Sequence, residues 1–307
     1  MPKALFFLAH CLYLRSEPGR TSPLLNITEG AVALRTTILG TACALALGSL
    51  AAGPAMADVS NFSAAAGVGY EHASVSGFHA NDWTFMGTAA VDTDWLHNMS
   101  VQGDINYQSV ADHYDGDGGV HVSDLSLSIS PFWRMPWGRI GAVVGLNDYD
   151  YYGALNERFV NFGGYAEWYV CPNVTLAVKG GGWTAEYYSS NQGSGYVGGQ
   201  ATWYAMPDLA ITGTVDYTGY PHNYGSSNET NYGVMAEWLV SESTPISVYA
   251  GWNGTSVSHS SDTVSTWMVG LKVYTDQNGA STLVDRQRSG SSTWATRFNP
   301  LLPLVDF

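Results

Sequence analysis

Cysteine and long apolar runs are scarce in this chain of 307 residues. Cys11 and Cys43 lie in the N-terminal segment, so Cys171 alone remains in the body of the chain. One cysteine excludes an internal disulfide framework. After Ala57, no stretch reaches the roughly 18 apolar residues of a membrane-spanning helix. Backbone pairing or a packed core must therefore hold the fold together.

Charge is the second scarce property of the sequence. Charged residues make up 12% of the chain, about half of the usual fraction for a soluble domain. Lys and Arg number 12 against 26 Asp and Glu, which gives a formal net charge of −14. A nucleic-acid partner is excluded because a phosphate backbone requires a basic face. Aromatic residues (13%) and glycines (35) are plentiful instead, a composition that favours strands over long amphipathic helices.

Residues 1–57 are interpreted as an N-terminal extension followed by a secretory signal peptide. A basic residue precedes the apolar stretch 36–50, and the small residues that end at Ala57 form a cleavage site. We predict cleavage after Ala57, which makes Asp58 the first residue of the mature chain. A single transmembrane anchor and a lipoprotein signal at Cys43 are the alternatives.

Apolar and polar residues alternate with a period of two from Asn61 to Tyr274. In the segment Met99–Gln108, every even position is polar and the odd positions are almost wholly apolar. The segments Leu209–Thr218 and Asp124–Ser130 alternate in the same way. This pattern predicts strands with one polar and one apolar face.

About twelve such segments follow one another, with centres near residues 66, 86, 103, 127, 143, 164, 179, 200, 213, 235, 249 and 269. Even-numbered segments end in tight turns such as Cys171-Pro-Asn and Met206-Pro-Asp, whereas odd-numbered segments run into longer polar loops. The repeating unit is therefore a hairpin of about 35 residues.

Tryptophan marks this repeat. Trp133, Trp168, Trp203 and Trp238 are spaced 35 residues apart, and Trp95 precedes the series by 38 residues. A fixed period of this size indicates one structural unit used repeatedly. Each of these tryptophans falls on the apolar face at the turn end of an even-numbered segment. An indole at that place suits a membrane–water interface.

These features predict an all-β fold, a closed antiparallel up-and-down transmembrane β-barrel over residues 58–275. We expect about 12 strands, with roughly 10 to 14 as the alternatives. Short turns at one end and long loops at the other are typical of barrels with both termini in the periplasm. A propeller, a solenoid and a soluble barrel also repeat or alternate. The polar face carries too few Lys and Glu for the solvent side of a soluble barrel, which favours the membrane barrel.

The signal peptide, the alternating hairpins, the interface aromatics and the terminal Phe307 together resemble the bacterial outer-membrane β-barrel and porin-like proteins, over Asp58 to Tyr274. The resemblance implies export to the outer membrane of a Gram-negative bacterium. It implies four partners, namely outer-membrane lipid, lipopolysaccharide, the barrel-assembly machinery and small polar solutes. The chain departs from the family because about thirty residues follow its last strand, Pro300 and Pro303 among them.

The inward polar face is the first candidate site, because carboxylates, amides and hydroxyls suit a hydrated path for small polar solutes. Asp58 to Tyr274 contains 21 acidic and five basic residues, a balance of −16 that favours cations. We predict a porin-like passive channel for small hydrophilic solutes. The open alternative is a non-conducting structural or surface-interaction barrel, filled by paired side chains. The candidate lumen-lining residues are Gln102, Asp104, Asn106, Asp124, Glu167, Lys179, Gln200, Asp216, Glu237 and Lys272.

Residues 276–307 are predicted to form a C-terminal tail, either periplasmic or folded into the lumen. The barrel is acidic, whereas the tail carries the basic residues Arg286, Arg288 and Arg297. We hypothesise that a tail in the lumen acts as a plug. Its arginines would then pair with the inward carboxylates Asp104, Glu167 or Asp216.

Metal binding and catalysis have weaker support in the sequence. The loop 112–119 carries Asp115 and Asp117 between glycines, but its spacing does not match a calcium loop. We predict neither a metal nor a cofactor. His121 and Ser123 share one strand face, as a base and a hydroxyl would in an outer-membrane lipid-modifying hydrolase. Since no orienting Asn or Asp is identified, we predict that the protein is not an enzyme and assign no catalytic residue.

Overall fold

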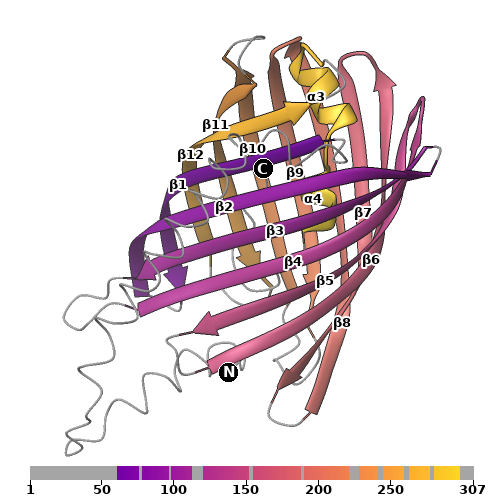
Figure 1. Ribbon diagram of the computed structural model, residues 1–307. Coiled ribbons are helices and arrows are strands. Elements are labelled where there is room, and N and C mark those ends of the chain that lie inside the picture. Colours follow the sequence, from indigo (N-terminus) through magenta and orange to yellow (C-terminus); the bar gives the residue numbers. More distant parts are fainter. Residues whose placement is uncertain are drawn as a thin grey trace, which may run out of the picture.

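A computed structural model describes residues 61–297, apart from 76–77, 97, 113–119, 152–154, 188–189, 221–227, 241–244, 259–262 and 277–279. Twelve antiparallel strands close into one barrel, in which each strand pairs with its neighbours in sequence and β12 pairs with β1 (Figure 1). The predicted fold class and strand number are therefore confirmed. The strands are β1 (Asn61–Val75), β2 (Phe78–Leu96), β3 (Met99–Asp112), β4 (Val120–Met135), β5 (Gly138–Tyr151), β6 (Leu155–Cys171), β7 (Val174–Tyr187), β8 (Ser190–Met206), β9 (Leu209–Gly219), β10 (Asn228–Leu239), β11 (Ile246–Val257) and β12 (Thr263–Asp276).

The two faces of the wall follow the alternation in the sequence. On β3, Gln102 and Gln108 are fully buried and face the lumen, whereas Ile105 between them is 45% exposed on the outer face. On β4, Ser130 is buried and Ile129 is 63% exposed. Closure gives every strand a hydrogen-bonded partner on both sides, as an apolar environment requires. The wall thus presents an apolar outer surface and a largely polar lumen.

Tight turns join the strands at one end of the barrel, which we call the turn end. Two residues connect β4 to β5, β6 to β7 and β8 to β9. Asn98, between β2 and β3, has a φ of 64°, a left-handed conformation that asparagine tolerates better than most residues. β1 begins and β12 ends at the turn end, as Asn61 pairs with Asp276.

Large inward side chains lie over glycines of neighbouring strands. The Tyr249 ring lies over Gly67 and Gly270, and a Cβ atom at Gly270 would be 2.0 Å from the Tyr249 hydroxyl oxygen. An aromatic ring over a strand glycine covers backbone that would otherwise lack packing. These glycines therefore leave room for bulky side chains inside a closed wall.

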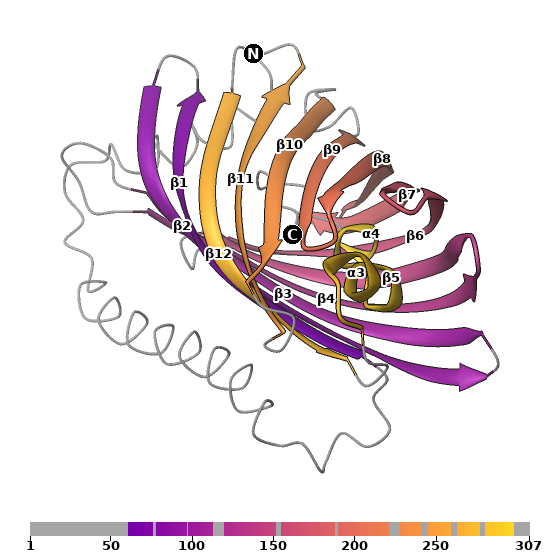
Figure 2. The same ribbon diagram turned by 90° about the horizontal axis from the view of Figure 1, so that it is seen from above.

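Two short helices follow β12. They are α3 (Leu283–Ser289) and α4 (Thr293–Thr296). Viewed from above in Figure 2, both helices lie inside the ring of strands. Within the residues that the structure covers, no helix is long and apolar enough to cross a membrane.

Candidate functional site

The ten candidate lumen-lining residues all lie on the inward face of the barrel. Nine of them are at most 8% exposed, and Gln200 is half-buried. Five of the ten form inward ion pairs with Arg139 or with each other, one between the neighbouring strands β5 and β6 and two across an intervening strand. Arg139 Nε lies 2.7 Å from Glu167 Oε2, Lys179 Nζ lies 3.2 Å from Asp216 Oδ1, and Lys272 Nζ lies 3.9 Å from Glu237 Oε2. Such buried pairs are costly to break, because loss of one partner leaves the other charge uncompensated.

The tail enters the lumen at the turn end. Thr282 caps α3, since its hydroxyl accepts a hydrogen bond from the Asp285 backbone N–H at 3.1 Å. Leu283 is fully buried, and its backbone N–H donates to the carbonyl of Pro207 at 2.9 Å. Its side chain joins a cluster of inward residues from four strands, namely Tyr204, Ala210, Leu239 and Tyr274. An apolar contact therefore fixes the start of the tail.

Arg288 fastens α3 to the hairpin of β6 and β7. Its Nη2 donates to the carbonyls of Cys171 at 2.7 Å and Val174 at 3.2 Å. Its Nε donates to the Thr175 hydroxyl at 3.2 Å. The guanidinium also lies over the rings of Tyr169 and Tyr204, at 4.8 and 5.5 Å from their centroids. One side chain thus combines three hydrogen bonds with two cation–π contacts.

The end of α3 and the segment between the helices bind the buried pair Arg139–Glu167. Arg139 Nη1 donates to the carbonyl of Gly290 at 2.5 Å and Nη2 to that of Gln287 at 3.3 Å. The Ser292 hydroxyl donates to Glu167, and the Ser292 backbone N–H donates to Gln102 Oε1 at 2.9 Å. The lumen wall therefore recognises the backbone of the tail as well as its side chains.

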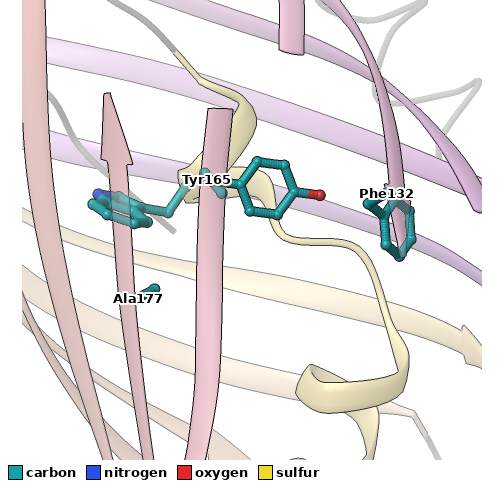
Figure 3. Packing of buried hydrophobic residues seen from close by; sticks show 5 residues of the cluster. Phe132, Tyr165 and Ala177 are labelled. Atoms are coloured by element: carbon teal, nitrogen blue, oxygen red, sulfur yellow. The ribbon is translucent and has the colours of Figure 1, made fainter. Parts of the chain in front are cut away.

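Trp294 in α4 reaches furthest into an apolar part of the wall. It is 2% exposed and packs with Phe132, Tyr165 and Ala177 from three strands, which Figure 3 shows from close by. Its Nε1–H donates to Asp216 Oδ2 at 3.2 Å. Lys179 Nζ lies 4.4 Å from the centroid of its ring. The helix of a single turn is held by its surroundings, because four residues cannot form a stable helix alone.

Arg288 and Arg297 donate hydrogen bonds to neutral acceptors, whereas the hypothesis paired the tail arginines with the carboxylates of Asp104, Glu167 or Asp216. Arg288 binds backbone carbonyls and a hydroxyl, and Arg297 Nη2 donates to the neutral Gln108 Oε1 at 3.1 Å. Ser292 and Trp294 bind the carboxylates of Glu167 and Asp216 instead. Arg286 is 7% exposed in α3. Net charge alone therefore does not specify the hydrogen-bond partners of Arg288 and Arg297.

Cavities of different size lie between the wall and the tail. One of about 490 Å³ lies beside α3 at the turn end and is lined by residues that include Asp94, Arg134, Asp285 and Arg288. Another of about 60 Å³ is lined by both wall and tail, including Glu167, Glu237, Lys272 and Trp294. That volume holds only a few water molecules. The space between the wall and the tail around Trp294 is therefore narrow.

Sequence reasoning missed the inward apolar residues. Trp183 is 1% exposed and meets Phe159 and Tyr220 edge-on, with centroid distances of 5.7 Å in both cases. Met86 and Met268 form another inward cluster with Tyr249. The signal was present in the parity of each strand, because these residues occupy positions of the polar face. The lumen is therefore a polar wall with apolar patches.

The tryptophans of the 35-residue repeat lie on the outer face. Trp133, Trp168, Trp203 and Trp238 are 41 to 54% exposed, each within three residues of the turn end of its strand. Trp95 belongs to β2, but its side chain lies outside the described residues. The repeat therefore follows one rim of the barrel.

The remaining candidates stay isolated. No group of three or more His, Cys, Asp or Glu in the described ranges is arranged to hold a metal ion, and Asp115 and Asp117 lie outside those ranges. Ser123 is partly exposed on β4, whereas the side chain of His121 lies outside the description. Neither a metal site nor a hydrolytic pair is therefore assembled from residues whose geometry is known.

Comparisons with known proteins agree with this fold. An outer membrane channel from Pseudomonas putida F1 is similar to this chain, with a TM-score of 0.52 and 14% identity over 69% of this chain and 95% of that chain. The translocator domain of the autotransporter NalP from Neisseria meningitidis gives 0.49 and 9%, over 80% and 97%. The KdgM porin gives 0.40 and 9%, over 67% and 98%. No protein-family model and no curated protein matches the sequence. The fold is that of the outer-membrane β-barrels.

Proposed function

We propose that the protein is a passive channel for small hydrophilic solutes in the outer membrane of a Gram-negative bacterium, and that its C-terminal tail holds the channel closed. The observation that carries this proposal is that the lumen wall is polar and charged. Its main occupant is the C-terminal tail, which is not one of the barrel strands. The strands close through the pairing of β12 with β1, so no strand needs the tail for closure.

A preference for cations is part of the proposal. Buried carboxylates outnumber buried cations on the inward face, with Arg139, Lys179 and Lys272 as the buried cations of the described strands. Towards the loop end, Glu71 and Asp82 face each other across β1 and β2, and Glu229 lies on β10. All three are at most 7% exposed. Carboxylates in a cleft with low-dielectric walls focus the field and concentrate cations.

The outer surface supports the proposed location and partners. Its exposed apolar side chains suit acyl chains, and the tryptophan rim suits the headgroup layer. Lipopolysaccharide and other outer-membrane lipids are the expected surroundings, with insertion by the barrel-assembly machinery. Export through a signal peptide that is cleaved after Ala57 completes the proposal.

One observation favours the alternative of a non-conducting barrel. The three buried cations of the described strands are each paired with an inward carboxylate, and the cavity beside Trp294 measures only about 60 Å³. If the tail never leaves, the barrel serves as a structural or surface-interaction element.

Planar-bilayer recording of the full chain and of a chain lacking residues 277–307 separates the two functions. We expect rare openings of the full chain and frequent openings of the shortened chain. The sign of the reversal potential should indicate a preference for cations. Heat-modifiable migration on gels checks that the shortened chain is folded. Folded but silent shortened barrels, or an anion preference, would contradict the proposal.

A further inference from the structure

The contacts of Trp294 have the composition of a binding site. Lys179 and Asp216, which are 5% and 4% exposed, contact two different parts of its indole ring. Lys179 lies over the π face at 4.4 Å, and Asp216 accepts the Nε1–H at 3.2 Å. Phe132 and Tyr165 belong to the same buried apolar cluster as the ring. We call these four residues, together with Ala177, the indole seat.

The seat also recognises peptide backbone and a positive charge. Lys179 Nζ donates to the carbonyls of Trp294 at 3.1 Å and Arg297 at 3.2 Å. Gln108 accepts from the Arg297 guanidinium at 3.1 Å. The wall therefore contacts three features of a short segment, namely the indole of a tryptophan, the backbone carbonyl of that tryptophan and a guanidinium three residues later.

The seat and its occupant are built by different parts of the chain. The wall residues come from β3, β4, β6, β7 and β9, and the barrel closes without α4. The occupant is a helix of four residues, too short to hold its own shape. The recognition chemistry therefore belongs to the wall.

We propose that the indole seat is a binding site for short basic peptides that carry a tryptophan, and that the tail is its tethered occupant. This inference rests on the tail withdrawal of the proposed function. A tether keeps its occupant at an effective concentration in the millimolar range. A free peptide therefore competes poorly with the wild-type tail, and binds well once the tail loses its indole.

A fluorescently labelled peptide with the sequence of residues 291–297 (Ser-Ser-Thr-Trp-Ala-Thr-Arg) provides the test. Fluorescence anisotropy is measured on the full-length chain in detergent micelles, as wild type and as Trp294→Ala. We expect saturable binding to the variant, with a dissociation constant lower than that of the wild type by at least about tenfold. The peptide in which Ala replaces Trp is the matched control and should bind about tenfold more weakly. Addition of Lys179→Met should abolish the difference between the two peptides.

Arg288→Met is titrated in parallel, since it loosens the tail at the turn end and leaves the seat unaltered. It too should bind the peptide more tightly than the wild type, and it keeps the test decisive if Trp294→Ala does not fold. Absence of saturable binding to the folded variants, or equal binding of both peptides, would overturn the inference. No current is involved, so a barrel that binds the peptide and never conducts counts against the channel alone. A barrel that conducts and ignores the peptide counts against the seat alone.

Discussion

Replacement of Arg288 by methionine tests how firmly the tail is docked. Methionine keeps an unbranched stem of similar length and removes the guanidinium. The change lies on the tail, so no buried carboxylate of the wall loses its partner. The carbonyls of Cys171 and Val174 accept hydrogen bonds from Arg288. They lie at a turn, where water replaces the lost guanidinium as the donor.

The expected magnitude follows from the contacts. Hydrogen bonds to a charged group contribute about 1.5–3 kcal/mol, and a partly exposed cation–π contact about 0.5–1 kcal/mol. Arg288 is half-buried, and water takes over most of its hydrogen-bond acceptors, so the net loss amounts to about one such hydrogen bond and two cation–π contacts at the low end of these ranges. We expect docking to weaken by about 2–3 kcal/mol, a factor of roughly 30 to 150.

Hydrogen–deuterium exchange of the full-length chain measures this change. Amides of α3 and α4 should exchange faster by that factor in Arg288→Met, while the strand amides keep their protection. Arg158→Met is the matched control, because Arg158 is 81% exposed and its ion pair with Asp148 spans 3.7 Å. An exposed pair of this kind contributes about 0–1 kcal/mol. Equal exchange of the tail in wild type and Arg288→Met would refute the docking described above.

Three further predictions concern the stability of the barrel, measured by chemical unfolding in lipid vesicles. Gly270→Ala should lower the free energy of unfolding by about 1–3 kcal/mol, since its Cβ would meet Tyr249 and the Ala66 carbonyl oxygen, whereas Gly103→Ala, with its nearest atom at 3.8 Å, should be neutral. Leu127→Arg, on an outer position that is 46% exposed, should cost about 2–4 kcal/mol if lipid covers it; an unchanged stability would argue against lipid contact. Arg139→Met should cost about 3–5 kcal/mol by leaving Glu167 unpaired, and adding Glu167→Gln should restore part of the loss. No recovery in the double variant would argue against this pair.

Alternation was sufficient to predict the barrel, because a strand that separates lipid from a polar lumen must alternate. The face of Gln102 and Ile105 follows from parity alone, and so does the outward position of Trp168. The 35-residue spacing predicted the hairpin unit, because each tryptophan of the repeat lies within three residues of the turn end of its strand.

The interior of the lumen was only partly predictable. Parity places Trp183 and Tyr165 inward. It does not predict that Tyr165 packs in one cluster with Trp294, which lies more than a hundred positions later in the chain. The basic tail suggested attraction to an acidic wall. The actual partners of Arg288 are carbonyls freed at a turn, which no charge count reveals. Contacts between segments far apart in sequence depend on three-dimensional register.

Current through single barrels of the full-length chain, recorded in one bilayer for wild type and Arg288→Met, tests the central claim most directly. Weakened docking should raise the open fraction by the same factor as the exchange rate of the tail, and the open current should reverse at a potential of cation sign. Folded Arg288→Met barrels that expose the tail to exchange and still pass no current would contradict the claim that the tail closes a conducting lumen.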